Sequence, residues 1–171
     1  VLGEVQQSSQ YFEKALAIYL EVHGEEHSDV AVTYRLLGLS FWGCNKDEQA
    51  LSCHEKALSI MLNIDCIERS EIAKTRDCLG DVLHALGRAA EARTQYVQAA
   101  EFGNRSSMRS LGLLMLEDDS REDGKAVEWL SLAAKEGDNE AAKLIEGLDG
   151  IPREEWPWNI RERMMDSEDP S

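Results

Sequence analysis

The sequence predicts an all-α fold in which antiparallel helix pairs stack side by side. Its composition favours helix, because only three prolines occur in 171 residues and all lie at or after position 152. Apolar residues recur at steps of three and four, which is the spacing of one helix face. The chain also repeats itself at an interval long enough for two helices. Each such helix buries its apolar face only against its neighbours, which indicates a stacked array.

The internal repeat first has an offset of 42 residues. The segment EKALAI at 13–18 returns as EKALSI at 55–60. The same offset relates Leu37 to Leu79, Gly38 to Gly80, Ala50 to Ala92 and Ala57 to Ala99. The offset then shortens to 34, which relates Ala92 to Ala126, Ala99 to Ala133 and Gly103 to Gly137. The early units therefore carry about eight extra residues, in the connection that contains VHGEEHSD.

We expect seven or eight helices, and the first three follow from the repeat. A helix at 4–22 matches second helices of later units, so its pairing helix is expected before residue 1 in a longer natural chain. A helix at 29–43 then carries Tyr34, Leu37, Gly38 and Phe41 on one face. After the break at GCNKD, a helix at 47–63 carries Ala50, His54 and Ala57. The small side chains of Gly38 and Ala50 allow the backbones of two helices to approach closely.

The later helices repeat these positions. A helix at 69–86 carries Arg76, Leu79, Gly80 and Leu83, and one at 88–102 carries Ala92, Tyr96 and Ala99. The remaining helices are expected at 106–117, 123–136 and 139–147. Each pair is joined by a short polar connection that contains turn residues.

The set Tyr34, Leu37, Gly38 and Phe41, followed by Ala50, His54 and Ala57, resembles the tetratricopeptide repeat. His54 departs from the aromatic residue usual at its position. The period of 42 and the string ALAIYLEVHGEEHSDVA are similar to the kinesin-light-chain variety, although Ser28 stands where that pattern has proline. The resemblance implies a right-handed α-solenoid and a non-catalytic protein-binding role.

From residue 104 the chain is similar to the Sel1-like repeat, which has the same helix pair. The residues that carry this likeness are Leu111, Gly112, Ala126, Trp129, Ala133, Ala134 and Gly137. The expected organisation is a second helix at 1–24, tetratricopeptide units at 25–66 and 67–103, a Sel1-like unit at 104–137, a truncated helix at 138–149 and a tail at 150–171.

His23, Glu26 and His27 form H-x-x-E-H, the short signature of inverted zinc peptidases. Such an enzyme needs both imidazoles on one continuous helix. Gly24 is expected to end the first helix, and Ser28 or Asp29 to cap the next. We therefore expect the two imidazoles on either side of a turn, with no metal, no cofactor and no catalysis.

In a stack of helix pairs, the first helix of each pair lines the concave side. We expect a partner to bind on that side. Counting from the anchor residues gives the expected lining: Arg35, Leu39, Trp42, Lys74, Asp77, Asp81, His84, Arg109, Leu113, Leu116 and Lys143. Trp42 would anchor a side chain, and the arginines and Lys74 would hold a carboxylate. The alternative is that these are ordinary exposed helix residues, with Trp42 against a preceding unit. Leu36 and Cys78 replace the asparagine by which kinesin-light-chain-like repeats grip a ligand backbone.

The tail after Gly150 changes composition to IPREEWPWNIRERMMDSEDPS. Pro152 and Pro157 prevent one continuous helix. One interpretation is a cap on the last helix pair, made by Trp156, Trp158, Ile160 and Met164. The alternatives are a disordered tail, or a linear motif that fills a groove of its own or another chain.

Charge and cysteine content narrow the class of protein. A net charge of −15 argues against nucleic-acid binding, which needs a basic patch. No segment approaches the length of a membrane span. Cys44, Cys53, Cys66 and Cys78 lie 9, 13 and 12 residues apart without a C-x-x-C pair, so buried free thiols in a cytoplasmic protein are expected.

The function expected from these features is a scaffold that binds a peptide or protein segment in its groove. The alternative is a structural spacer or oligomerisation module, which self-associates through the tail or the truncated repeat end. An enzyme is not expected, because the sequence contains no glycine-rich phosphate loop, no nucleophile elbow and no paired metal ligands on one helix.

Overall fold

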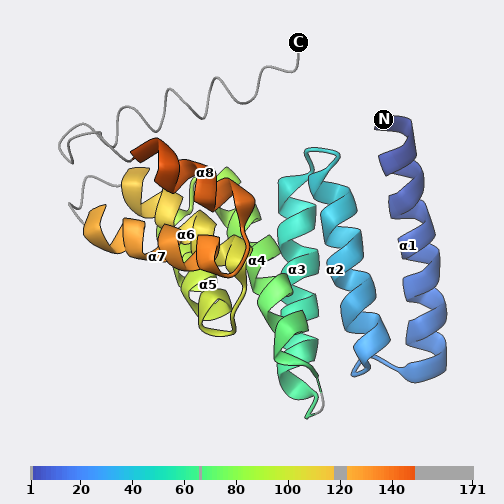
Figure 1. Cartoon of the computed structure of the whole chain (residues 1–171). Coiled ribbons are helices and arrows are strands. Elements are labelled where there is room, and N and C mark those ends of the chain that lie inside the picture. Colours follow the sequence, from blue (N-terminus) through green and yellow to red (C-terminus); the bar gives the residue numbers. More distant parts are fainter. Residues whose placement is uncertain (1, 66, 118–122, 149–171) are drawn as a thin grey trace. The chain divides into compact units, whose positions relative to one another are not determined.

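The structure, a computed structural model, describes residues 2–65, 67–117 and 123–148. These residues form eight α-helices and, within the described ranges, no strand (Figure 1). The chain divides into two compact units, Val1–Asn104 and Arg105–Ser171. The prediction of an all-helical fold built from consecutive helix pairs is confirmed.

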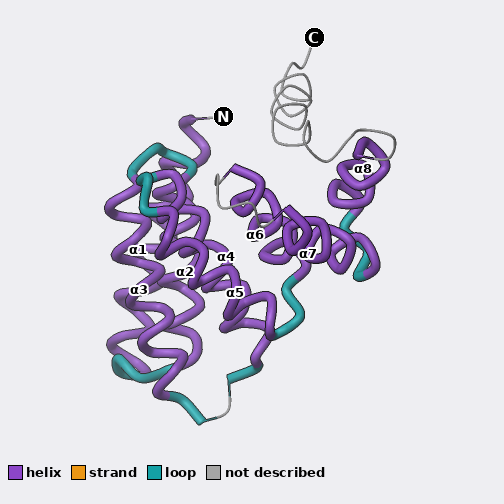
Figure 2. Tube along the Cα trace, turned by 90° about the vertical axis from the view of Figure 1, so that its left-hand side faces the viewer, coloured by secondary structure: helices purple, strands orange, loops and turns teal. Residues whose placement is uncertain are grey.

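Unit 1 (Val1–Asn104) holds five of these helices. They are α1 (Leu2–His23), α2 (Ser28–Trp42), α3 (Asp47–Asn63), α4 (Arg69–Ala85) and α5 (Ala89–Glu101). Each helix packs on the next along the chain, most extensively α2 on α3 and α4 on α5. Short connections, teal in Figure 2, reverse the chain between them. The observed bounds lie within two residues of those predicted from the repeat.

Glycine allows close approach within both pairs of unit 1. A Cβ atom at Gly38 would lie 2.7 Å from Cε1 of His54, and one at Gly80 would lie 2.5 Å from Cε1 of Tyr96. Both rings are buried, so neither has room to move away. The predicted packing reason for Gly38 is therefore confirmed, and its contact is the His54 ring of α3.

Two local predictions for unit 1 are corrected. The N-cap of α2 is His27, whose side chain accepts a hydrogen bond from Asp29 N–H; neither Ser28 nor Asp29 takes that position. An imidazole nitrogen can supply the same acceptor as a hydroxyl or carboxylate. Cys44 lies half-buried in the turn after α2 and not in a helix; of the other described cysteines, Cys53 is buried in α3 and Cys78 is half-buried in α4.

Unit 2 (Arg105–Ser171) contains α6 (Arg105–Glu117), α7 (Asp123–Lys135) and α8 (Asn139–Leu148). Here Gly112 repeats the close approach, because a Cβ atom would lie 2.7 Å from Cγ of Leu130. Asp138 caps α8 by accepting hydrogen bonds from the N–H groups of Glu140 and Ala141. The predicted cap residues Trp156, Trp158, Ile160 and Met164 lie outside the described residues.

Candidate partner-binding surface

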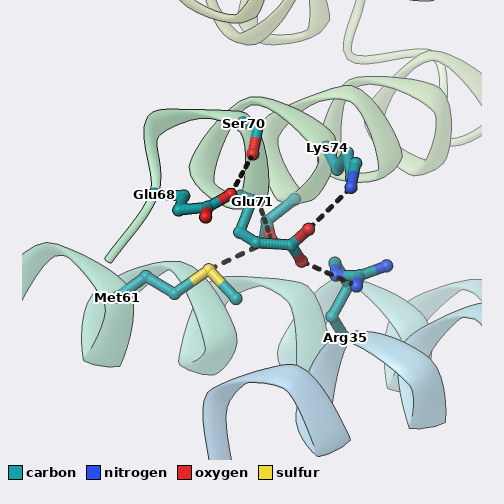
Figure 3. A network of polar contacts seen from close by, with 7 residues as sticks. Arg35, Met61, Glu68, Ser70, Glu71 and Lys74 are labelled. Atoms are coloured by element: carbon teal, nitrogen blue, oxygen red, sulfur yellow. Dashed lines mark hydrogen bonds and ion pairs between the residues drawn. The ribbon is translucent and has the colours of Figure 1, made fainter. Parts of the chain in front are cut away.

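The predicted lining of unit 1 comes from α2 and α4, and the structure joins its two cations at one carboxylate. Arg35 Nη2 lies 3.0 Å from Glu71 Oε2, and Lys74 Nζ lies 2.6 Å from Glu71 Oε1 (Figure 3). The Arg35 and Glu71 side chains are 14% and 26% exposed. The hydrogen bond from Lys74, together with the Arg35 charge, lowers the pKa of the Glu71 carboxyl. Glu71 is therefore a charged link between α2 and α4.

Packing beneath this carboxylate fixes the position of α4 on α3. The Thr75 hydroxyl donates a hydrogen bond to the Glu71 carbonyl oxygen at 2.9 Å, and its Oγ1 lies 3.2 Å from Met61 Sδ. Thr75 and Met61 are both buried. These contacts hold the first turn of α4 in place, and so fix the position of the Glu71 backbone from which the side chain extends.

The other predicted residues of unit 1 lie along the same helices. Leu39 and Trp42 are half-buried on α2, and their spacing from Arg35 places all three on one helix face. On α4, Asp77 and Asp81 are half-buried and His84 is exposed. Asp81 accepts a hydrogen bond from the Tyr96 hydroxyl at 2.8 Å, which ties it to α5.

Cys78 stands at the position where kinesin-light-chain-like repeats have an asparagine that binds the ligand backbone. Its side chain is half-buried between the two aspartates of α4. Burial, with the charges of Asp77 and Asp81, raises the pKa of the Cys78 thiol to about 12. The thiol therefore stays protonated near neutral pH, which disfavours a role as nucleophile or metal ligand.

In unit 2 the predicted lining residues occupy α6 and α8. Arg109 forms ion pairs with Asp138 and Glu140, and its Nε lies 3.2 Å from Asp138 Oδ2. Leu113 is half-buried and Lys143 is exposed. Leu116 is only 4% exposed, so it packs inside the unit and offers little surface to a partner.

A cleft that the sequence did not predict lies between the α1–α2 connection, α2 and α3. Its volume is about 360 Å³, and it is lined by Glu25, Glu26, Val30, Tyr34, Lys56, Ser59, Ile60 and Asn63. The Lys56 ammonium lies 5.5 Å from the centre of the Tyr34 ring, within range of a cation–π contact. The cleft could have been anticipated from the eight extra residues of the 42-residue period, because this segment supplies its acidic wall, Glu25 and Glu26.

The H-x-x-E-H segment adopts the predicted turn, with His23 and His27 on either side of it. Helix α1 ends at His23, Gly24 has φ +79°, and α2 begins at Ser28. The two rings nevertheless stack, with centroids 4.2 Å apart and planes 13° from parallel. A turn that reverses the chain brings its two ends together, so a broken helix does not separate these side chains.

Two comparisons with known proteins bear on the class of this chain. The tetratricopeptide repeat family matches residues 1–63, which span α1 to α3. A comparison with curated proteins found no match. Tetratricopeptide repeats generally mediate protein–protein interaction and are generally non-catalytic. Among the described helices, none is both long and apolar enough to cross a bilayer.

Proposed function

We propose that this protein is a non-catalytic scaffold that holds a segment of a partner protein along the α2–α4 face, defined by Arg35, Leu39, Trp42, Glu71 and Lys74. The observation that carries the proposal is the pair of cations from different helices on one half-buried carboxylate. The face thus offers a fixed polar centre with apolar side chains one and two turns away along α2.

The chemistry of this face favours a segment with a carboxylate and a large apolar side chain. Such a carboxylate would compete with Glu71 for Arg35 and Lys74, because both cations are already positioned to donate. The apolar side chain would pack on Trp42, which remains half-buried rather than covered. Aromatic and arginine side chains are the residues that most often dominate binding energy.

A selection from a random peptide library on the full chain tests this proposal. Peptides recovered are titrated against wild type and the Arg35→Ala and Trp42→Ala variants, with folding checked by circular dichroism. We expect each variant to weaken binding at least about tenfold, the loss typical of a dominant contact. The matched control is Lys56→Ala, which changes an exposed cation in the cleft. Loss of binding in Lys56→Ala alone would move the site to the cleft and refute the proposal.

Finer assignment of the repeats is part of this proposal. We assign 25–66 and 67–103 to the kinesin-light-chain-like variety and 104–137 to a Sel1-like unit, flanked by the partial helices 1–24 and 138–149. The close approach of Gly112 to Leu130 in the α6–α7 pair supports a shared packing rule, as do the corresponding approaches at Gly38 and Gly80. A cytoplasmic location agrees with the free thiols of the three described cysteines.

A second candidate function is self-association, and the exposed face of α1 favours it. Tyr11, Ile18 and Val22 are large, exposed apolar residues on this helix. Their spacing of seven and four residues places them on one stripe. Light scattering of wild type and of an Ile18→Ser, Val22→Ser double variant tests this candidate. A monomer at all concentrations in wild type would refute it.

A further inference from the structure

The turn between α1 and α2 gathers two imidazoles and one carboxylate, those of His23, His27 and Asp29, which lie outside the proposed binding face. Gly24 takes a left-handed conformation, with φ +79°, and its N–H donates to the Leu20 carbonyl oxygen at 3.1 Å. This conformation favours glycine, and it turns the chain sharply at the end of α1. The imidazole of His27 consequently stacks on the imidazole of His23.

Asp29, in the first turn of α2, completes the group. Its Oδ2 lies 3.9 Å from His23 Nε2 and 3.5 Å from His27 Nδ1. One donor atom from each of the three residues lies within 4.8 Å of the others. A tetrahedral ion with bonds of about 2.0–2.2 Å separates its donors by about 3.3–3.6 Å. Side-chain rotation closes the difference, because the three side chains are 34%, 38% and 51% exposed.

We propose that His23, His27 and Asp29 bind one divalent transition-metal ion, with water at the remaining positions. Two imidazoles and one carboxylate suit Zn²⁺, Co²⁺ or Ni²⁺, whereas Mg²⁺ and Ca²⁺ prefer oxygen ligands. The ion would join the end of α1 to the start of α2, and so would act as a clasp between two helices. The exposed Glu25 and Glu26 and the net charge of −15 raise the local concentration of cations.

The cap of α2 sets a limit on the affinity. His27 Nδ1 accepts a hydrogen bond from Asp29 N–H at 3.2 Å. An ion at that nitrogen would replace this hydrogen bond, so binding exchanges one stabilising contact for another. His23 has no part in the cap, which makes it the residue whose substitution tests the metal site without removing the α2 cap.

Titration of the full chain with Co²⁺, followed by visible and near-ultraviolet absorption, tests the site. We expect one equivalent of bound cobalt with weak bands typical of nitrogen and oxygen ligands. His23→Gln and Asp29→Asn should each weaken binding at least about tenfold, while the matched control His84→Gln should not change it. Saturating Zn²⁺ should also raise the melting temperature of wild type but not of His23→Gln.

Three outcomes would overturn the metal site. One is the absence of cobalt binding by wild type at millimolar concentration. Another is a strong near-ultraviolet thiolate band, which would assign the metal to cysteine. The third is unchanged affinity in His23→Gln, with circular dichroism showing that this variant is folded.

Discussion

Replacement of His54 by phenylalanine should stabilise the protein and remove much of its sensitivity to mild acid. His54 has 0% exposed surface, and neither ring nitrogen has a hydrogen-bond partner among the described residues. Burial lowers the pKa of the His54 imidazole from 6.5 to about 4, and the positive charge of Arg35 adds to this effect. The folded protein therefore holds His54 neutral at pH values where the unfolded chain binds a proton.

The size of this effect follows from the difference in pKa. Because the unfolded state binds more protons between about pH 6.5 and 4, stability falls as the pH is lowered through that range. Between pH 7 and pH 5 the loss attributable to His54 is about 2 kcal/mol. Glu71 does not contribute to this loss in that interval, because its lowered pKa costs stability only below its ordinary value of 4.5. At pH 7, removing two unpaired buried nitrogens adds about 1–3 kcal/mol of stability to the variant.

A six-membered ring fits this position, as the second pair of unit 1 shows. Tyr96 occupies the equivalent place beneath Gly80, with its ring carbon 2.5 Å from the position that a Cβ atom at Gly80 would take. His54→Phe is therefore compared with wild type by urea denaturation at pH 7 and pH 5. The control His84→Gln removes an exposed histidine and should keep the wild-type pH dependence. An equal loss of stability in wild type and His54→Phe between the two pH values would refute the reasoning.

Three further variants test the packing and the polar contacts. Gly80→Ala places a Cβ atom against the Tyr96 ring. This variant should lower the free energy of unfolding by about 1–3 kcal/mol, measured by thermal or urea denaturation. An unchanged stability would show that the α4–α5 pair is loosely packed. Asp138→Ala removes both the cap of α8 and the ion pair with Arg109, and loss of the cap alone should cost about 1 kcal/mol. Asp138→Asn keeps an acceptor for the cap and should recover that part; equal losses in both variants would assign the effect to the ion pair. Glu71→Gln should remove the part of acid sensitivity below about pH 4.5, because the lowered pKa makes Glu71 stabilising above that pH. Melting curves with the same acid dependence as wild type would show that its contacts with Lys74 and Arg35 contribute little.

The sequence predicted the helices well, because their positions depend on local periodicity. Apolar residues at steps of three and four define each face, and the repeated Leu-Gly pairs at 37–38 and 79–80 mark the close approach of each helix to its partner. Each of these signals lies within a short segment, so the sequence pattern alone is enough to predict the helices.

The site could be predicted only in part, because its contacts join segments far apart in sequence. Glu71 meets Arg35 across 36 residues, and nothing local to either indicates the pair. The stack of His23 on His27 depends on the left-handed backbone of Gly24 and on ring rotation, which periodicity does not specify. Leu116 was assigned to the concave lining by counting from the anchor residues of the repeat. That count carries no information about burial, and the structure buries Leu116.

The most direct measurement of the binding proposal is hydrogen–deuterium exchange of the full chain with and without a selected peptide. If the α2–α4 face holds the segment, added protection should concentrate in peptides covering Tyr34–Trp42 and Glu71–His84. Protection confined to the turn at Gly24–His27 and to Lys56–Asn63 of α3, with the α2–α4 face unchanged, would contradict it.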